Sequence, residues 1–89
     1  MSWIKAVEIV PGYLVRSPYG SRDVVLEINE AVHYPSHVEL SGWKVNTRTW
    51  AEKHFTGGKW RKATQLWFIA DQRGAWEYPP VRVAGPLTR

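Results

Sequence analysis

The chain contains no cysteine among its 89 residues, which excludes disulfide bonds and zinc sites built on thiolates. A cysteine-free chain suits a reducing compartment, so we expect a cytoplasmic protein. Long apolar runs are also missing, because the longest covers only residues 66–70, far below the roughly 20 residues of a membrane helix. Lys5 and Glu8 interrupt the first ten residues, so we expect neither a signal peptide nor a membrane partner.

Motifs for catalysis are missing as well. No serine stands in a Gly-x-Ser-x-Gly elbow, and no glycine-rich phosphate loop occurs. Two of the three histidines, His33 and His37, flank an expected turn close to Glu39. This trio has the atoms to hold a metal ion or to supply a general base, but its spacing is not specific, and turn side chains usually face water. We therefore expect no enzymatic activity, no cofactor and no metal site.

Large aromatic side chains are abundant in this short chain. Six Trp, four Tyr and two Phe occur, and each ring removes about 150–250 Å² from water when it is buried. A chain of this length buries only about two thirds of the surface that it exposes when unfolded, so its core needs such rings. We expect one small β-rich domain spanning residues 1–89.

Alternating apolar residues and frequent turn residues indicate a mainly β fold. Glycine and proline recur at short intervals, as in Pro11-Gly12, Gly57-Gly58 and Pro79-Pro80. This pattern predicts a small barrel or a strongly bent antiparallel sheet. The expected strands cover residues 3–10, 13–16, 24–34, 38–47, 64–70, 75–78 and 81–84.

The strands at 24–34 and 38–47 allow a more detailed prediction. In the first, Glu30 marks a point where the buried face meets water, and alternation places five apolar residues on that face: Val24, Leu26, Ile28, Val32 and Tyr34. In the second, the apolar parity changes between Leu40 and Trp43. That change predicts a β-bulge at Ser41-Gly42.

The segment after the second of these strands is open to two interpretations. Thr49 and Glu52 have the spacing of a helical capping box, which would begin at most one short helix, at about residues 50–56. A four-residue pattern is common by chance, so a continued strand and loop over the same residues is an equal alternative.

Charge is distributed unevenly along the chain. The net charge is +4, yet residues 23–43 contain four acids and no Lys or Arg, whereas residues 44–62 contain six Lys or Arg and one acid. If the two segments lie apart, the basic one forms a free patch. If they form adjacent strands, their charges partly neutralise each other. The sequence leaves both arrangements open.

Basic and aromatic residues interleave in the segment 44–62, a pattern typical of nucleic-acid binding. Cations neutralise phosphates, and exposed rings stack on bases. We expect a non-enzymatic domain that binds DNA or RNA, single strands in particular, with weak sequence preference because no element is shaped to read base edges. Each tryptophan taken singly is more often a core residue than a contact. The expected contact residues are Lys44, Arg48, Trp50, Lys53, Lys59, Trp60, Arg61 and Lys62.

The alternative is a protein-interaction or inhibitor module that binds a larger partner protein. Trp, Tyr and Arg dominate the energetics of interfaces. Four such residues surround Pro79-Pro80 near an expected edge strand: Arg73, Trp76, Tyr78 and Arg82. The strand at 81–84 would equally allow a homodimer by edge-to-edge pairing. Carbohydrate binding on aromatic platforms is a third class, but its usual extracellular setting fits poorly with a chain in which no export signal is expected.

Overall fold

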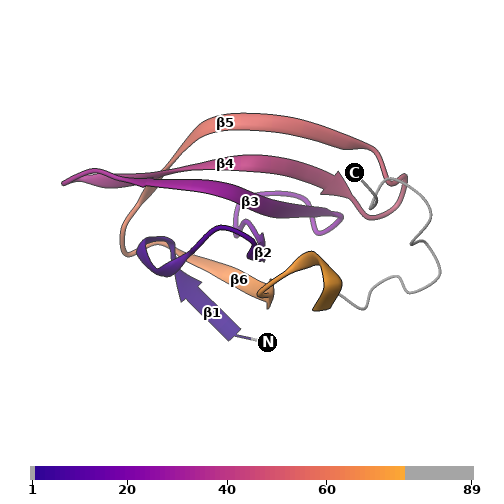
Figure 1. Cartoon of the computed structure of the whole chain (residues 1–89). Helices are drawn as coiled ribbons and strands as arrows, with labels where there is room; N and C mark the ends of the chain where they lie inside the picture. Colours follow the sequence, from indigo (N-terminus) through magenta and orange to yellow (C-terminus); the bar gives the residue numbers. More distant parts are fainter. Residues whose placement is uncertain (1, 76–89) are drawn as a thin grey trace.

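A computed structural model describes residues 2–75 and shows one antiparallel sheet of six strands. The strands pair in the order β1-β6-β2-β3-β4-β5, so β1 and β5 form the two edges. The sheet bends back on itself without closing, with β3, β4 and β5 above and β6 and β1 below in Figure 1. The mainly β, strongly bent sheet predicted from the sequence is confirmed. Its elements are β1 (Ser2–Lys5), the 3-10 turn η1 (Ala6–Glu8), β2 (Leu14–Arg16), β3 (Val24–His33), β4 (His37–Asn46), β5 (Glu52–Arg61), β6 (Gln65–Ala70) and the 3-10 turn η2 (Arg73–Ala75).

The main core lies between the two halves of the bent sheet. The η1 turn lies against β4 and β5. Its backbone is held there because the N–H groups of Ala6 and Val7 donate to the carbonyls of Thr64 (2.8 Å) and Lys62 (3.2 Å). This turn therefore covers part of the core where the sheet stays open. The buried core residues are Ala6, Ile9, Val15, Leu26, Ile28, Val38, Leu40 and Leu66.

A β-bulge lies in β3 at Asn29. The residues on either side of Asn29 pair with Gly42 and Ser41, two consecutive residues of β4, so Asn29 has no opposite residue. The prediction placed the bulge at the correct level of the sheet but in the wrong strand. At this level the β3 backbone approaches Gly42 so closely that a Cβ there would overlap with the carbonyl oxygen of Glu27, so the glycine read as the bulge site is instead the residue that the bulged strand packs against.

The bulge reverses the alternation of β3. Beyond Asn29, Ala31 packs against the main core, whereas Val32 and Tyr34 are exposed. The prediction that Val32 and Tyr34 share the buried face of the first half of the strand is therefore wrong. One inserted residue moves every later side chain to the other face. Glu30 is exposed, as expected for a point where the buried face meets water.

Residues 50–56 form no helix, and β5 (Glu52–Arg61) pairs with β4 over this region instead. The polar groups before β5 close a turn, in which Asn46 Oδ1 accepts from the N–H groups of Arg48 (2.9 Å) and Thr49 (3.1 Å). The structure thus takes the strand-and-loop alternative. A helix of two turns would gain few hydrogen bonds for the cost of its nucleation, whereas the strand gains a ladder with β4 that continues through one irregularity.

The strand expected at 64–70 is present as β6, between β1 and β2. The strands expected at 75–78 and 81–84 lie outside the described residues, apart from Ala75, which ends η2. Within residues 2–75, no helix has the length and the apolar character that are needed to cross a membrane.

Candidate functional site

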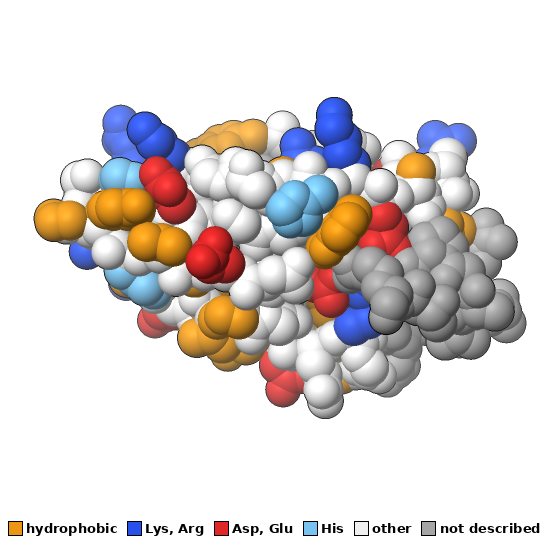
Figure 2. Space-filling model, turned by 45° about the horizontal axis from the view of Figure 1, so that its top comes forward, with side chains coloured by type: hydrophobic (Ala, Val, Ile, Leu, Met, Phe, Trp, Pro, Cys, Tyr) orange, Lys and Arg blue, Asp and Glu red, His pale blue; other side chains and the backbone are white. Residues whose placement is uncertain are grey.

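The strands β3, β4 and β5 present two faces of different charge. The core face, which packs on the main core, carries Lys44 and Lys53. Along β4, Lys44 lies on the same face as Val38 and Leu40 because side chains alternate, and Lys53 is the partner of Lys44 on β5. The acidic and basic segments are therefore neighbours in the sheet. Lys44 and Lys53 project away from the acidic side chains, whereas Lys59 and Arg61 share their face. Figure 2 looks onto the outer face, where Asp and Glu side chains are spread and Lys and Arg side chains gather along the upper margin. By the same register, the outer face carries the carboxylates Glu27, Glu30, Glu39 and Glu52.

Lys44 and Lys53 are directly opposite each other on β4 and β5, and we call them the lysine pair. Both side chains are exposed. Like charges in directly opposite positions have Cβ atoms about 4.5–5.5 Å apart and destabilise a sheet. Among residues 2–75, the ion pairs within 4.0 Å involve His37, Arg48 and Arg73, and none includes the lysine pair. The described part of the fold therefore concentrates positive charge at the lysine pair without an ion pair to neutralise it.

Arg73 holds two carboxylates of the outer face. Its Nη2 lies 2.8 Å from Glu27 Oε1 and 3.4 Å from Glu52 Oε1. The three side chains are 16%, 12% and 8% exposed, so the cluster is largely shielded from water. Arg73 was expected at a protein-interaction surface, and these contacts engage it within the fold. The other residues of that expected surface, Trp76, Tyr78 and Arg82, lie outside the described residues.

Trp60 lies on the core face of β5, opposite Val38. Its indole is half-buried and packs against the main core. Tyr19, in the loop between β2 and β3, lies over it with ring centroids 6.3 Å apart and an angle of 9° between the ring planes. Tyr19 is 81% exposed. Trp60 thus supports the core and also contributes to an open aromatic surface.

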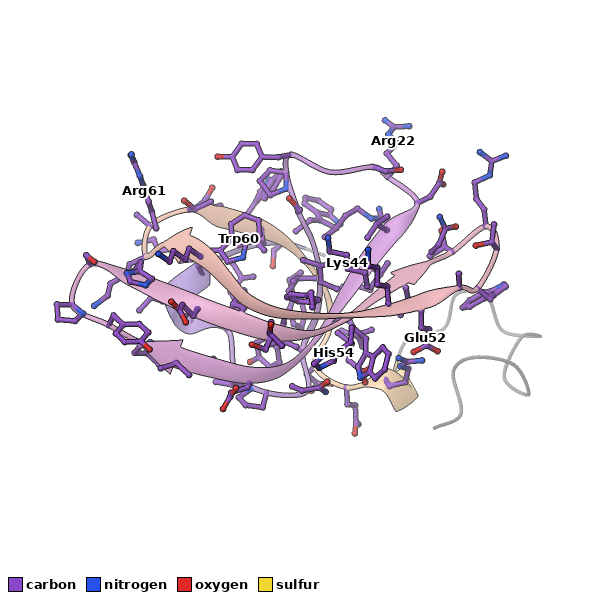
Figure 3. The ribbon with its side chains drawn as sticks, turned by 90° about the horizontal axis from the view of Figure 1, so that it is seen from above. Arg22, Lys44, Glu52, His54, Trp60 and Arg61 are labelled. Atoms are coloured by element: carbon purple, nitrogen blue, oxygen red, sulfur yellow. The ribbon has the colours of Figure 1, made fainter. Side chains whose placement is uncertain are left out.

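The loop that carries Tyr19 also carries Arg22, which is exposed. Figure 3 shows Arg22, Lys44 and Trp60 on one side of the β4–β5 ribbon, and His54 and Glu52 on the other. The first three therefore belong to a common side of the molecule. We call the following residues the candidate surface: Tyr19, Arg22, Lys44, Lys53 and Trp60.

Trp50 is removed from the predicted contact set by its position. The ring closes the turn before β5 and is 3% exposed. The backbone of Trp50 adopts a left-handed φ of 64°, and its N–H donates to the carbonyl of Asn46 (2.7 Å). A side chain turned into the interior in this way is not accessible to a base.

The remaining predicted contacts are distributed around the candidate surface. Lys59 is opposite Glu39, which places it on the outer face of β5. Arg61 ends the strand, and Figure 3 shows it beyond Trp60. Arg48 lies at the opposite end of the sheet, where its exposed guanidinium is 3.8 Å from Asp23. Lys62 is half-buried in the turn after β5.

The histidines near the β3–β4 turn make local contacts. His37 Nδ1 is 3.0 Å from Ser36 Oγ, and His37 Nε2 is 3.4 Å from Glu39 Oε2. The ring of His37 stacks on Tyr34, with centroids 4.8 Å apart. In the part of the chain that the structure describes, no three His, Asp or Glu residues gather in a way that could hold a metal ion.

Sequence reasoning missed Tyr19 and Arg22. The available signal was the turn Pro18-Tyr19-Gly20, which places a large ring at an exposed tip, followed closely by a cation. Nothing local to this loop indicates that it reaches across the sheet to β5. That proximity follows from the bend of the sheet.

Comparison of the chain with protein-family models, with curated proteins and with solved structures gave no match. Its function is therefore inferred from the chemistry of the candidate surface.

Proposed function

We propose that this protein binds single-stranded nucleic acid on the candidate surface. The observation that carries the proposal is the lysine pair, two cations held directly opposite each other and not neutralised by any carboxylate among residues 2–75. A polyanion that contacts both ammonium groups relieves their repulsion and releases counterions from its own backbone. The rings of Tyr19 and Trp60 supply π faces on which bases stack.

The dimensions of the surface suit a strand rather than a single phosphate. Lys44 and Val38, the partner of Trp60, are six residues apart on β4. At about 3.3 Å per residue, this separation is about 20 Å, a distance that several nucleotides of an extended strand cover. Small β domains that bind single strands use sites of about 4–16 nucleotides. Ammonium groups and ring faces read no base edge, so the proposed binding has weak sequence preference.

The lysine pair gives the decisive test. A variant with Lys44→Gln and Lys53→Gln is compared with one carrying Lys5→Gln and Lys59→Gln, which removes the same net charge from exposed residues outside the candidate surface. Affinity for a fluorescent oligothymidylate is measured by anisotropy over a series of salt concentrations. Each lost phosphate contact makes the slope of log K against log salt shallower by about 0.7, so the first variant loses about 1.4 from the slope. For each tenfold rise in salt, the affinity of the wild type is therefore expected to fall by a factor about 25 times larger than the affinity of this variant.

The control variant is expected to keep nearly the slope of the wild type. Equal weakening by both variants would mean that only net charge matters, and the proposed surface would be wrong. Wild-type binding that does not change with salt would reject the polyanion itself as the ligand.

A second candidate function is self-association through the β1 edge, and one observation favours it. Trp3, on this edge strand, is 52% exposed and makes a T-shaped contact with Trp67 at 5.0 Å. Exposed tryptophans at a sheet edge are typical of surfaces that bind protein. A wild-type chain that fails to bind the oligonucleotide at low salt but sediments as a dimer would replace the first proposal with this one.

A further inference from the structure

The geometry of Tyr19 and Trp60 allows a more specific conclusion about the ligand. The two ring planes are nearly parallel, at 9°, and their centroids are 6.3 Å apart. This value is near the wide end of the range of about 4.5–7 Å for aromatic pairs in contact. Successive bases of a nucleic acid are stacked about 3.4 Å apart, so a base between two rings needs them about 6.8 Å apart. The gap between the ring planes cannot exceed the centroid distance of 6.3 Å, so the rings must separate by about half an ångström or more to admit a base.

The exposure of the two rings shows that they do not seal against each other. A phenol ring covered on one face by an indole would lose a large part of its accessible surface, yet Tyr19 remains 81% exposed. Trp60 is fixed, because its indole is half-buried and packs against the main core. Tyr19 is carried on a loop outside the strands, where its N–H donates to Ser17 Oγ (3.1 Å). One ring is therefore anchored in the core, and the other is carried on a loop.

We infer that Tyr19 and Trp60 form a clamp that takes one unpaired base between their rings. The inference rests on the proposed function and names the feature that is recognised, a single base free of its neighbours and of a pairing partner. Arg22, in the same loop as Tyr19, is exposed and lies on the same side of the molecule as Trp60 (Figure 3). Its guanidinium would be available to a phosphate of the bound strand. A duplex does not offer an unpaired base, so the clamp selects single strands and loops. DNA and RNA are both ligands, because neither ring reads the 2′-hydroxyl.

The clamp is tested with Tyr19, whose exposed side chain can be changed without disturbing the core. The probe is a short oligothymidylate with one central 2-aminopurine, whose fluorescence is quenched when it stacks, together with its uridine counterpart. Wild-type protein and Tyr19→Phe are expected to quench both probes. Tyr19→Ala is expected to lose about 5- to 150-fold in affinity, the range for one lost base–aromatic stack, and most of the quenching. An oligomer of the same length that is abasic at every position is expected to bind wild type and Tyr19→Ala equally, because it offers no base to the clamp.

The outcomes separate the clamp from the proposed function. If Tyr19→Ala binds and quenches like the wild type while binding still depends on the lysine pair, the clamp is wrong and the proposed function stands. If a duplex with the same central base is quenched as strongly as the single strand, the clamp is also wrong. If the wild type binds none of the probes at low salt, both proposals are wrong. Circular dichroism of Tyr19→Ala shows whether the fold is intact in each comparison.

Discussion

At the scale of single residues, Gly42 determines how β3 and β4 can pair. The bulge at Asn29 brings the β3 backbone into the space that a Cβ at Gly42 would occupy. Glycine is required there by a close approach of two backbones and not by an unusual φ. The neighbouring strand β5 has a different glycine requirement, because Gly57 adopts a left-handed φ of 63° with open space around it.

Gly42→Ala is therefore expected to lower the free energy of unfolding by about 1–3 kcal/mol or more, as overpacking does, since β3 and β4 must move apart. Gly74→Ala is the control, because among residues 2–75, apart from its neighbours in the chain, none places an atom within 4 Å of the position of a Cβ at Gly74. Urea denaturation followed by circular dichroism measures both. Equal midpoints for the two variants would show that β3 accommodates the methyl group without cost.

Trp50 and Trp60 show why the role of a tryptophan depends on its position in the fold. Both occur in the basic segment with polar neighbours, yet Trp50 is buried and Trp60 is half-buried under an exposed tyrosine. Trp50 is directed inward by a turn that Asn46 caps. Trp60 is directed to the core face by the register of β5.

At the scale of elements, β5 combines two cross-strand charge pairs of opposite kind. Lys53 is opposite Lys44, whereas Lys59 is opposite Glu39. A pair of like charges destabilises the sheet, and a pair of opposite charges stabilises it, each by about 0.2–1 kcal/mol. The two lysines of one edge strand therefore have contrary effects on stability.

Lys53→Gln is expected to raise the free energy of unfolding by about 0.2–1 kcal/mol, and Lys59→Gln to lower it by a similar amount. Thermal or urea denaturation at low ionic strength measures both changes, and both are expected to shrink as salt is added. The variant that gains stability is also the one that loses affinity for the oligonucleotide. A loss of stability in Lys53→Gln would show that this side chain has a structural role that outweighs the repulsion.

At the scale of the whole molecule, Arg73 joins three parts of an open sheet. It follows β6 in the chain, and its Nη2 contacts Glu27 of β3 and Glu52 of β5. The same contacts engage two carboxylates on the outer face, while the core face keeps the lysine pair.

Arg73→Met is expected to lower the free energy of unfolding by about 3–5 kcal/mol, because it leaves two shielded carboxylates close together. Arg48→Met is the control, since its ion pair with Asp23 has a length of 3.8 Å and an arginine that is 77% exposed. A surface pair of this kind contributes about 0–1 kcal/mol. Denaturation midpoints that fall equally in the two variants would contradict a structural role for the shielded cluster.

Local patterns in the sequence were sufficient for much of the fold. Alternation over Val24, Leu26 and Ile28 predicted the buried face of the first half of β3, and Pro11-Gly12 marked a turn. The turn expected at Gly57-Gly58 was wrong, because these residues lie within β5. The pattern failed beyond Asn29, because a bulge depends on the backbone of the opposite strand. It could not decide the interpretation of Thr49 and Glu52 either, since the ladder with β4 competes with the helix.

For the candidate site, the sequence indicated the chemistry but not the arrangement. Lys44, Lys53 and Trp60 were among the predicted contacts, whereas Tyr19 and Arg22 were not. Trp50 and Lys59 were included because they are close in sequence, although the turn and the register direct them elsewhere. Proximity along the chain does not determine the face of a sheet on which a side chain lies.

The sequence by itself determined the β class, the positions of most turns, the absence of disulfides and the presence of a basic segment. These properties follow from residue type and from an alternation that spans only a few residues. Only the tertiary structure decided that Lys44 is opposite Lys53, that the carboxylates of β3, β4 and β5 lie on the other face, and that Tyr19 reaches Trp60. The physical reason is that strand register and the bend of the sheet depend on contacts between residues far apart in the chain.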